Sequence, residues 1–271
     1  MTRANQRGCM NKLEKLKLLL QQYGSVLVAY SGGVDSTFLL AYAVKVLGHS
    51  NVLAVTAVSE TYPEAELKAA RLYAKKIGAG HLVIKTLELN NKKFSGNPVN
   101  RCFYCKDELF RKLSAAAKKR GMALCDATNY SDRSDFRPGR LAAKKWGVKS
   151  PLFEARVSKD ELRSFSRSMK LPNWDHPAQA CLASRVPYGT VITPLILKKI
   201  EKAEKYLQNK GFSVFRVRDH GDVARIELGA GEIKKLFATD AVSVARYFKS
   251  LGWRYVSIDI EGYRTGSLNP K

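Results

Sequence analysis

The chain has 271 residues, of which 45% are apolar and 26% charged, and its 47 Lys and Arg residues outnumber its 24 Asp and Glu residues. This length allows one large domain or two modest ones, and the apolar content excludes an intrinsically disordered chain. The formal net charge of +23 points to an anionic partner, a nucleotide or a nucleic acid, with an inert basic surface as an equal alternative.

The N-terminal segment, residues 1–24, predicts an amphipathic helix of the mature protein. Lys12, Lys15 and Lys17 interrupt its leucines, so it lacks the apolar run of a signal peptide. No stretch approaches the roughly 18 consecutive apolar residues of a membrane span. The five cysteines, an odd number, do not resemble a secreted disulfide framework. We therefore expect a cytoplasmic protein that has no contact with a membrane.

The first half of the chain alternates strand-like and helix-like segments. We expect strands over residues 25–30, 51–58, 81–86 and 122–127, and helices over 35–48, 63–78 and 105–120. This alternation predicts an α/β fold in which helices cover both faces of a parallel sheet.

The pattern changes after about residue 188. We expect a helix over 194–210, two alternating strands over 213–219 and 222–228, a helix near 231–250 and a strand near 254–260. The segment 175–190 has two prolines and a glycine and predicts a loop. The sequence therefore predicts two domains, residues 1–188 and a small α+β domain over residues 189–271.

The stretch SGGVDS begins at Ser31, directly after the first strand and before a helix. Gly32 and Gly33 let the backbone approach a ligand closely, and the free N–H groups of the next helix point to the same place. Ser31 and Ser36 add hydroxyl donors, so the motif predicts a nest for phosphate or pyrophosphate. Asp35 would repel phosphate, and its expected role is that of a helix N-terminal carboxylate or a contributor to Mg²⁺ binding. A turn that merely requires glycine is the weaker alternative.

A second polar stretch, DATNYSDRSDFRPG, follows the fourth expected strand. It places Asp126, Thr128 and Asn129 at the carboxyl end of that strand, where open α/β sheets bind ligands. The rest of the stretch carries the charged residues Asp132, Arg133, Asp135 and Arg137. For Asp132 and Arg133 a solvated polar loop is an equal alternative.

Three thiols form a candidate metal site. Cys102 and Cys105 form a CxxC pair near the start of a helix, where a depressed thiol pKa is expected. The pair follows the third strand, whereas a thioredoxin-like motif would follow the first. Cys181 supplies a third thiol. His176 could complete a Cys₃His zinc site, whereas three cysteines without a fourth ligand suit a 4Fe–4S cluster with one open iron.

The other two cysteines carry less weight. Cys125 lies in the apolar strand segment MALCDA, and we expect it to be a buried packing residue. Cys9 lies in the N-terminal segment, and we expect it to have no role.

Taken together, these motifs resemble the LarE family of ATP-dependent sacrificial sulfur transferases, within the PP-loop ATP pyrophosphatase superfamily. The resemblance extends over almost the whole chain. The matching stretches are residues 31–36, 126–139, 180–190, 203–207, 215–228 and 255–266. One departure is small, because DATN stands where DGTN is common in the family.

The resemblance implies a reaction. ATP adenylates a carboxylate of pyridinium-3,5-dicarboxylate mononucleotide, giving pyrophosphate and then AMP. Sulfur is inserted to give a thiocarboxylate, on the way to the nickel-pincer nucleotide cofactor of lactate racemase. The implied partners are this small nucleotide substrate and a sulfide donor, without nucleic acid, and we expect a homo-oligomer.

The resemblance also implies one of two sulfur sources. In one version of the family, a cysteine at the position of Cys181 attacks the acyl-adenylate and gives up its own sulfur. In the other, three cysteines hold a 4Fe–4S cluster whose open iron carries the sulfide. Since Cys102 and Cys105 accompany Cys181, the chain resembles the cluster version. The implied cofactors are ATP, Mg²⁺ and this cluster.

Further roles follow from the same resemblance. The five residues of SGGVDS named above match the ATP phosphate site, near which Asp126 lies, and residues 1–188 would be the adenylation domain. Ser184 and Arg185 follow the reactive cysteine, and Arg185 could neutralise a phosphate or the acyl-adenylate. Residues 189–271 would bind substrate and support oligomerisation.

Two arginines of the second domain match a site for the substrate phosphate. Arg216 and Arg218 alternate on one expected strand and therefore share a face, and two guanidiniums suit bidentate phosphate contacts. Glu204 and Asp240 match acidic positions that would orient the arginines. The alternative is a solvated strand face with a cross-strand partner such as Glu227.

Two other functions remain open at this point. One is a tRNA thiolase of the same superfamily, which the net charge favours and the lack of further CxxC pairs disfavours. The other is a nucleotide-binding sensor with structural zinc at the three thiols and His176.

Overall fold

The computed structural model describes residues 11–134, 138–176, 180–264 and 266–268. These residues form two units. The first unit takes the chain up to Ser59 together with residues 64–87 and 102–179. The second unit takes residues 60–63, 88–101 and the chain from Ala180 onward.

This division differs from the expected boundary between residues 188 and 189. Two short segments of the first half belong to the second unit because backbone hydrogen bonds tie them to it. Leu182 N donates to Thr61 O at 3.1 Å, and Ile192 N donates to Ser95 O at 2.7 Å. Such pairing between distant segments leaves no periodic pattern in the sequence.

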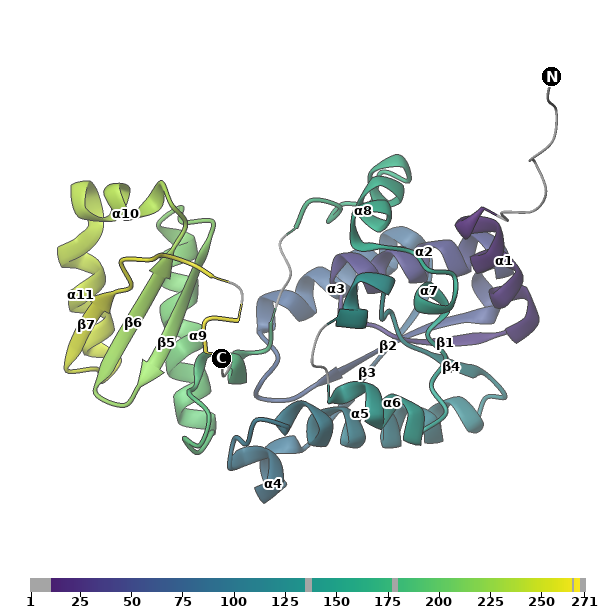
Figure 1. The fold of residues 1–271 in the computed structure, drawn as a ribbon, viewed down its shortest axis with the longest axis horizontal. Coiled ribbons are helices and arrows are strands. Elements are labelled where there is room, and N and C mark those ends of the chain that lie inside the picture. Colours follow the sequence, from purple (N-terminus) through teal and green to yellow (C-terminus); the bar gives the residue numbers. More distant parts are fainter. Residues whose placement is uncertain (1–10, 135–137, 177–179, 265, 269–271) are drawn as a thin grey trace. The chain divides into compact units, whose positions relative to one another are not determined.

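The first unit contains a sheet of four parallel strands in the order β3-β2-β1-β4 (Figure 1). The strands are β1 (Val26–Ala29), β2 (Val52–Val58), β3 (Gly80–Lys85) and β4 (Ala123–Cys125). In the register of the sheet, Val26 of β1 lies between Val52 of β2 and Ala123 of β4.

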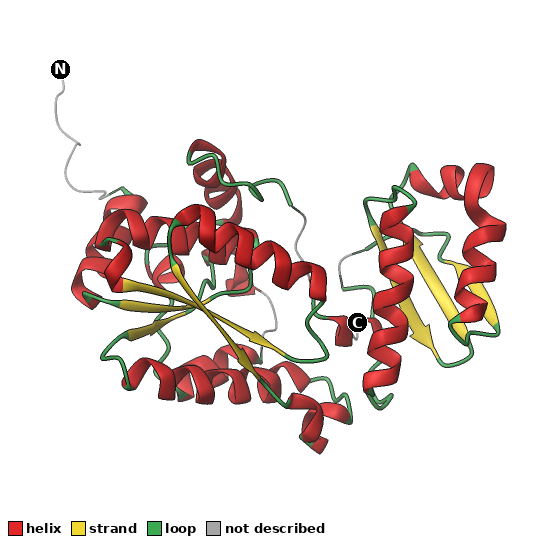
Figure 2. Cartoon of the chain, turned by 180° about the vertical axis from the view of Figure 1, so that it is seen from behind, coloured by secondary structure: helices red, strands yellow, loops and turns green. Residues whose placement is uncertain are grey.

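Helices cover both faces of this sheet (Figures 1 and 2). One face carries α1 (Lys12–Tyr23), α2 (Val34–Leu47), α3 (Glu64–Ile77) and α8 (Lys159–Ser168), and the other carries α5 (Arg101–Lys118) and α6 (Gly139–Lys145). Val26 and Val28 of β1 pack into the core beneath the first set of helices, whereas Leu27 packs with Phe110 of α5. Burial on both faces explains the continuous apolar run of this strand. The predicted α/β class is confirmed.

Several short elements were not expected from the sequence. They are α4 (Lys92–Ser95), α6, α7 (Pro151–Glu154), α8 and the 3-10 turns η1 (His49–Asn51), η2 (Glu88–Asn90), η3 (Tyr130–Ser134) and η4 (Leu182–Arg185). Six of these eight are three to five residues long, which is too short for a helical period to show. α8 is longer and begins with a capping box, in which the Ser158 hydroxyl accepts from Glu161 N and the Glu161 carboxylate accepts from Ser158 N.

The second unit contains a three-stranded sheet in the order β5-β6-β7. Its elements are α9 (Pro194–Asn209), β5 (Phe215–His220), β6 (Val223–Leu228), α10 (Glu232–Lys235), the π-helical turn η5 (Leu236–Asp240), α11 (Ala241–Ser250) and β7 (Tyr255–Ile258). β5 and β6 form an antiparallel hairpin, and β7 runs parallel to β6. The helix expected near 231–250 is thus three consecutive pieces, and the small α+β unit is confirmed.

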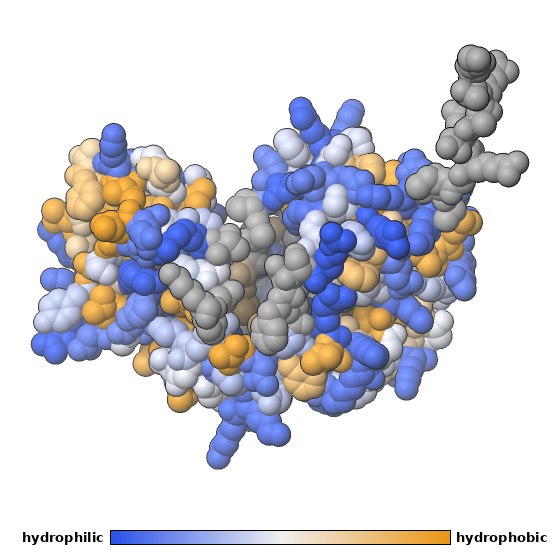
Figure 3. Space-filling view, in the orientation of Figure 1, coloured by the Kyte–Doolittle hydropathy of each residue, from blue (hydrophilic) through white to orange (hydrophobic). Residues whose placement is uncertain are grey.

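The two units differ in surface character (Figure 3). In this view the first unit presents mainly hydrophilic residues, whereas the second shows an apolar area around α10. The exposed apolar side chains of the adjoining segment include Phe237 and Val242. Among the described residues, none of the helices combines the length and apolarity that a membrane span needs.

Candidate active site

The SGGVDS turn joins β1 to α2 and is shaped for a close backbone approach. Gly32 has a φ of 72°, and a Cβ at this position would lie 2.9 Å from the Ala70 Cβ, so only glycine fits without a shift. The Ser36 hydroxyl accepts from Ser31 N at 3.3 Å and donates to Gly33 O at 3.1 Å. The turn is therefore held closed over the N-terminus of a 14-residue helix, an arrangement that suits an anion.

Asp35 lies in the first turn of α2 and has two partners. One carboxylate oxygen forms an ion pair with Lys159 Nζ, and the other accepts from the Asn129 amide at 2.9 Å. The Lys159 ammonium offsets the negative charge that would otherwise repel a phosphate. Side chains thus bind both oxygens of Asp35. Of the two expected roles, that of a helix N-terminal carboxylate is therefore simpler than that of a Mg²⁺ ligand.

Lys159 was not among the expected site residues. It is the first residue of α8 and follows the capping residue Ser158 directly. Glu161 of the same capping box also binds Lys12, and this ion pair together with the backbone N–H of Ser158 lowers the pKa of Glu161 to about 2. The S-x-x-E spacing of the capping box was the sequence signal that could have located this helix start and its lysine.

Asn173 is a second residue that the sequence did not single out. Its side chain is buried, and its amide donates to Gly32 O at 2.8 Å and to the Thr37 hydroxyl at 3.0 Å. Among the described residues, no donor reaches its buried Oδ1. Asn173 therefore fixes the glycine turn from a segment far along the chain.

Asp126 follows β4 as expected and lines a cavity of about 220 Å³ with residues that include Arg140 and Phe153. Its carboxylate accepts from the Thr128 hydroxyl at 2.8 Å and from the Ser150 hydroxyl at 2.7 Å. The Arg140 guanidinium stacks on the Phe153 ring, 4.6 Å from its centroid. Two hydroxyl groups thus hold the Asp126 carboxylate in place where it lines this cavity, at the carboxyl end of the sheet.

The charged loop after Asn129 divides into two kinds of residue. Asp132 is buried and accepts from Asn129 N at 3.1 Å, whereas Arg133 is exposed and stacks on the Tyr130 ring. The alternative of a solvated polar loop therefore holds for Arg133 but not for Asp132. Two further charges of this stretch, Asp135 and Arg137, lie outside the described residues.

The thiols differ in exposure. Cys102 is exposed and Cys105 half-buried in the first two turns of α5, and their spacing puts both on one face of the helix. Cys181 is exposed and caps the turn η4. Cys125 is fully buried in β4, and this burial raises its pKa, as expected for a packing residue. Cys9 lies outside the described residues.

Within the part of the chain that the structure describes, no group of three or more His, Cys, Asp or Glu side chains is arranged to hold a metal ion. The His176 ring packs edge-on against Tyr73, with the ring centroids 6.5 Å apart.

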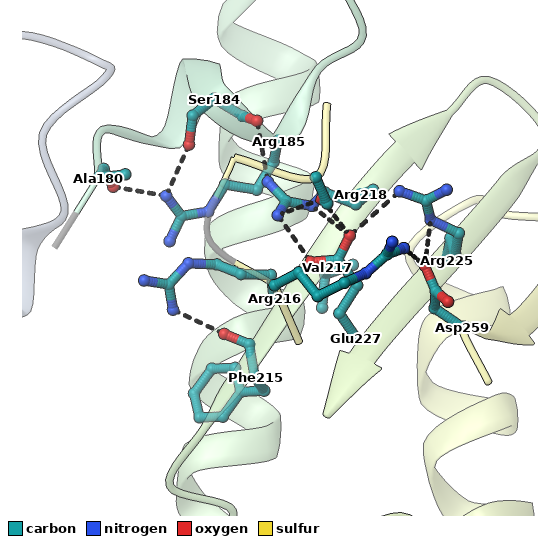
Figure 4. Close-up of polar contacts among 12 residues, drawn as sticks. Ala180, Ser184, Arg185, Phe215, Arg216, Val217, Arg218, Arg225, Glu227 and Asp259 are labelled. Carbon is teal, nitrogen blue, oxygen red and sulfur yellow. Dashed lines mark hydrogen bonds and ion pairs between the residues drawn. The ribbon is translucent and has the colours of Figure 1, made fainter. Parts of the chain in front are cut away.

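Arg185 holds the loop that carries Cys181 (Figure 4). Its Nε and Nη2 form a bidentate pair with Glu204 of α9 at 3.0 and 2.9 Å. Its Nη1 donates to the carbonyl oxygens of Ala180 and Cys181 and to the Ser184 hydroxyl. The buried guanidinium therefore shapes the backbone on both sides of the thiol.

Arg218 of β5, like Arg185, uses its guanidinium to bind both a carboxylate and a backbone carbonyl (Figure 4). Its Nε and Nη2 bind the two carboxylate oxygens of Glu227 at 3.0 and 2.6 Å, and its Nη1 donates to Ser184 O at 3.0 Å. Arg225 and Ser267 also donate to Glu227. The cross-strand partner is thus Glu227, as the alternative interpretation expected, but this strand face is buried and not solvated.

Arg216 shares that face and stands in a different environment. Its Nη1 donates to Phe215 O, and its guanidinium stacks on the Tyr263 ring. Burial, and then the nearby positive charge of Arg185, lower the pKa of Arg216. Excess positive charge in a half-buried site attracts an anion.

The two acidic residues expected to orient the arginines have different partners. Glu204 binds Arg185 and also accepts from Val217 N at 3.1 Å, so it connects α9 to β5. Asp240 forms an ion pair with Lys210 at 2.9 Å, and this pair lowers the pKa of Asp240. Of these two acidic residues, only Glu204 therefore binds one of the arginines near Cys181, namely Arg185.

Comparison with known proteins places these features in context. Residues 10–133 match the NAD synthase family. The chain is 41% identical to an uncharacterised protein of Synechocystis sp. over 96% of this chain and 97% of that protein. It is 36% identical to the pyridinium-3,5-bisthiocarboxylic acid mononucleotide synthase of Lactiplantibacillus plantarum, over 95% of this chain and 94% of that enzyme. It is also 28% identical to an uncharacterised protein of Methanocaldococcus jannaschii over 94% of this chain.

Proposed function

We propose that this chain, which belongs to the LarE family of ATP-dependent sulfur transferases, converts a carboxylate of a pyridinium mononucleotide into a thiocarboxylate. The near full-length similarity to the L. plantarum synthase carries the proposal. The SGGVDS turn between β1 and α2 supports the ATP dependence, and so does the match to the NAD synthase family. We propose pyridinium-3,5-dicarboxylate mononucleotide as the substrate and the nickel-pincer nucleotide as the eventual cofactor.

The proposed reaction has two steps. A carboxylate oxygen of the substrate attacks the α-phosphorus of ATP, pyrophosphate leaves, and an acyl-adenylate forms. Sulfide then attacks the acyl carbon, the C–O bond to AMP breaks, and the thiocarboxylate forms as AMP leaves. If the Cys181 thiolate attacks instead, a thioester forms as AMP leaves, and loss of the Cα proton with cleavage of the Cβ–S bond then releases the thiocarboxylate and leaves dehydroalanine at position 181. An acyl-adenylate is a good electrophile, and thiolate or sulfide is a good nucleophile near neutral pH.

The SGGVDS turn supplies the phosphate site of the first step. Its backbone N–H groups and the N-terminus of α2 would stabilise the leaving pyrophosphate. Lys159 lies at this turn through its ion pair with Asp35, so its ammonium is available to a phosphate that displaces the carboxylate. Mg²⁺ would be bound mainly through phosphate oxygens, because both oxygens of Asp35 already have partners.

We propose Arg216 as the contact for the substrate phosphate. Its pKa is lowered by burial and by the charge of Arg185, so a phosphate dianion would relieve the excess positive charge. Arg218 binds Glu227, Ser184 and Ser267 and would hold the frame of this site. Arg216 and Arg218 thus divide the roles of contact and support.

We further propose that Cys102, Cys105 and Cys181 hold a 4Fe–4S cluster. Thiolates are the favoured ligands of such a cluster and the thiols of Cys102 and Cys181 are exposed, but the described residues show no group of three ligating side chains already gathered to hold a metal. When bound, such a cluster would supply the sulfide for transfer. Arg101, which precedes Cys102, has a buried Nε that reaches no acceptor among the described residues, and this donor suits an anionic group.

Anaerobic purification with metal analysis tests the proposal. We expect a brown protein with iron and acid-labile sulfide, and ATP–pyrophosphate exchange that depends on the dicarboxylate substrate. A colourless protein with one equivalent of zinc and no exchange would contradict both the cluster and the enzyme. Loss of H₂S from the peptide that carries Cys181 after one turnover would show that Cys181 itself is the sulfur donor.

A pair of cysteine variants assigns the transferring thiol. Cys181→Ala should abolish thiocarboxylate formation and leave adenylation intact, measured by ATP–pyrophosphate exchange. Cys125→Ala is the matched control, because its thiol is buried in β4, and it should retain iron and sulfur transfer. Thiocarboxylate formation by Cys181→Ala would show that the role assigned to Cys181 is wrong.

The net charge of +23 favours a second candidate, thiolation of tRNA. Binding of tRNA measured on filters over a range of salt concentrations separates the two, since contacts with many phosphates give a steep salt dependence. Tight binding with a steep slope, without turnover of the mononucleotide, would favour tRNA.

A further inference from the structure

The segment that follows β7 is fastened to the end of β6 within the second unit. Asp259 N donates to Ile226 O at 2.9 Å. Further along, Tyr263 N donates to Leu228 O at 2.8 Å. Between them Gly262 has a φ of 70°, and a Cβ at this position would lie 2.8 Å from Leu228 O. The chain therefore needs glycine here to bring the backbone of Tyr263 against β6.

This attachment places the Tyr263 ring over Arg216 of the neighbouring strand β5. Arg216 pairs across the hairpin with Glu227, the residue before Leu228. The guanidinium carbon of Arg216 lies 5.2 Å from the centre of the Tyr263 ring, within the ~6 Å range of a cation–π contact. Both residues are half-buried, and Arg216 Nη1 donates to Phe215 O at 2.6 Å. The ring and this carbonyl together restrict where the guanidinium can point.

The Tyr263 ring differs from the partners of the nearby arginines because it carries no charge. Glu204 binds Arg185, and Glu227 binds Arg218, each through two hydrogen bonds. A carboxylate in such a pair fixes the guanidinium and also neutralises it. The face of an aromatic ring attracts a guanidinium through its quadrupole and adds no negative charge. A ring can therefore hold a guanidinium in place while its positive charge stays available to an anion.

An arginine that is ordered in advance makes a better phosphate site than one that is free to rotate. A long side chain loses rotamer freedom when an anion fixes it, and this loss lowers the affinity. A guanidinium that is already held avoids most of the loss, and its planar fork can then bind two phosphate oxygens at once. The contact with the uncharged Tyr263 ring thus suits a phosphate site.

We propose that Tyr263 is a positioning residue, whose ring holds the Arg216 guanidinium in the orientation that binds the substrate phosphate. This inference rests on the proposed function, which assigns the phosphate contact to Arg216. The role belongs to the ring and not to the hydroxyl, because the ring face makes the contact with the guanidinium. Tyr263 therefore acts on the phosphate through Arg216.

Isothermal titration calorimetry of the full-length chain tests the inference without turnover. The two probes are pyridinium-3,5-dicarboxylate mononucleotide and the corresponding riboside, which lacks the phosphate. The ratio of the riboside Kd to the mononucleotide Kd measures what the phosphate contributes to binding. Tyr263→Leu removes the ring and should lower this ratio about tenfold, with the riboside Kd unchanged. Tyr263→Phe keeps the ring and should retain the ratio of the parent protein.

A double variant separates positioning from general support of the fold. Arg216→Met removes the guanidinium and should lower the ratio at least as much as Tyr263→Leu does. Adding Tyr263→Leu to Arg216→Met should lower the ratio no further, because Tyr263 acts through the side chain that is already gone. A residue that merely supports the fold would lower the ratio again in the double variant.

A similar pair of residues in the same unit supplies the matched control. Tyr255 is 58% exposed, and the guanidinium carbon of Arg254 lies 5.7 Å from its ring centroid. Tyr255→Leu makes the same chemical change outside the proposed site and should retain the parent ratio. If Tyr263→Leu fails to fold by far-UV circular dichroism, Tyr263→Met takes its place in every comparison, with the same expected results.

The outcomes distinguish this inference from the proposed function. A parent ratio in folded Tyr263→Leu, an equal loss in Tyr263→Phe, or a further loss in the double variant would overturn the positioning role alone. If Arg216→Met keeps the parent ratio, the phosphate contact assigned to Arg216 is wrong, and the inference falls with it. A parent protein that binds neither probe would overturn the proposed substrate and the inference that rests on it.

Discussion

Replacement of Glu227 by Gln should strongly destabilise the second unit. Glu227 is fully buried, and its two oxygens accept from Arg218 Nε and Nη2, from Arg225 Nη2 and from the Ser267 hydroxyl, at 2.6 to 3.1 Å. Glutamine removes the charge and turns one acceptor oxygen into an NH₂ group that faces N–H donors. Arg218 then loses its only ion-pair partner among the described residues while it remains buried.

The expected cost follows from this burial. The side chain of Arg218 is 6% exposed and that of Glu227 is 0% exposed, so water cannot replace the lost contacts. Breaking one partner of a buried ion pair costs about 3–5 kcal/mol, a large share of the ~5–15 kcal/mol that stabilises a typical domain. The exposed pair of Arg254 and Asp222, with side chains 70% and 64% exposed, is the matched control. Asp222→Asn should cost less than about 1 kcal/mol.

Hydrogen exchange measured by mass spectrometry is the suitable assay, because it reports the opening free energy of each unit separately. At pH 7 the opening free energy of the β5 and β6 peptides should fall by about 3–5 kcal/mol in Glu227→Gln, whereas that of the β1 and β2 peptides should not change. A loss below about 1 kcal/mol would refute the argument from burial.

The pH dependence gives a second check on Glu227. Burial alone would raise its pKa, but the hydrogen bonds from Arg218 and Ser267 and the charges of Arg218 and Arg225 hold the pKa below its ordinary value of 4.5. A lowered folded-state pKa gives stability that is fully present above 4.5 and is lost as the pH falls through the folded-state value. The difference between the parent and Glu227→Gln should therefore shrink in acid, and growth of that difference would contradict the reasoning.

Three further substitutions test other parts of the structure. Gly32→Ala puts a Cβ 2.9 Å from the Ala70 Cβ at a left-handed φ, so ATP–pyrophosphate exchange should fall by about tenfold or more, whereas full exchange would exclude a close backbone approach at this turn. Cys125→Ala should lower the free energy of unfolding in urea by about 1 kcal/mol, because it leaves a small cavity beside β1. Asp240→Asn breaks an ion pair with the partly exposed Lys210 and should leave the midpoint of urea unfolding nearly unchanged, with unchanged affinity for the mononucleotide.

The parallel sheet could be predicted from sequence because burial on both faces leaves unbroken apolar runs. The segment SVLVAY predicted a strand over 25–30, and β1 covers Val26–Ala29. The tight turn between β1 and α2 could be predicted from its two glycines, since glycine between a strand and a helix marks a place where the backbone turns sharply. Local sequence determines both features.

The residues that complete the candidate site were harder to predict because tertiary contacts bring them there. Lys159 reaches Asp35 from α8, and Asn173 reaches Gly32 from a loop beyond it. Neither contact has a periodic signature, although the capping box before Lys159 could have located the helix start. The segment 88–101 belongs to the second unit through its contacts with residues 186–192, which the alternation of strands and helices does not encode.

The strand alternation placed Arg216 and Arg218 on one face, and their pairing with β6 agrees, because Arg216 lies opposite Glu227 and Arg218 opposite Arg225. The alternation of residues could not predict which segments of the chain lie over this face. Ser184 O and the Ser267 hydroxyl both contact Arg218, so this strand face is closed by the loop after Cys181 and by the C-terminal segment and is not the solvated face of the alternative interpretation.

This cover links the thiol to the arginines through Arg185. The Arg185 guanidinium donates to Glu204 through Nε and Nη2 and to the Cys181 carbonyl through Nη1. Glu204 in turn accepts from the backbone N–H of Val217, which lies between the two arginines of β5. The position of the Cys181 backbone and the position of β5 are therefore set by one side chain. Lysine cannot replace it, since a single ammonium lacks the planar fork that satisfies a carboxylate and backbone carbonyls at once. A loss of sulfur transfer on changing Arg185 would consequently report displaced geometry at the thiol as well as a missing charge, and the two are separated by whether the rate at which iodoacetamide alkylates Cys181 changes with it.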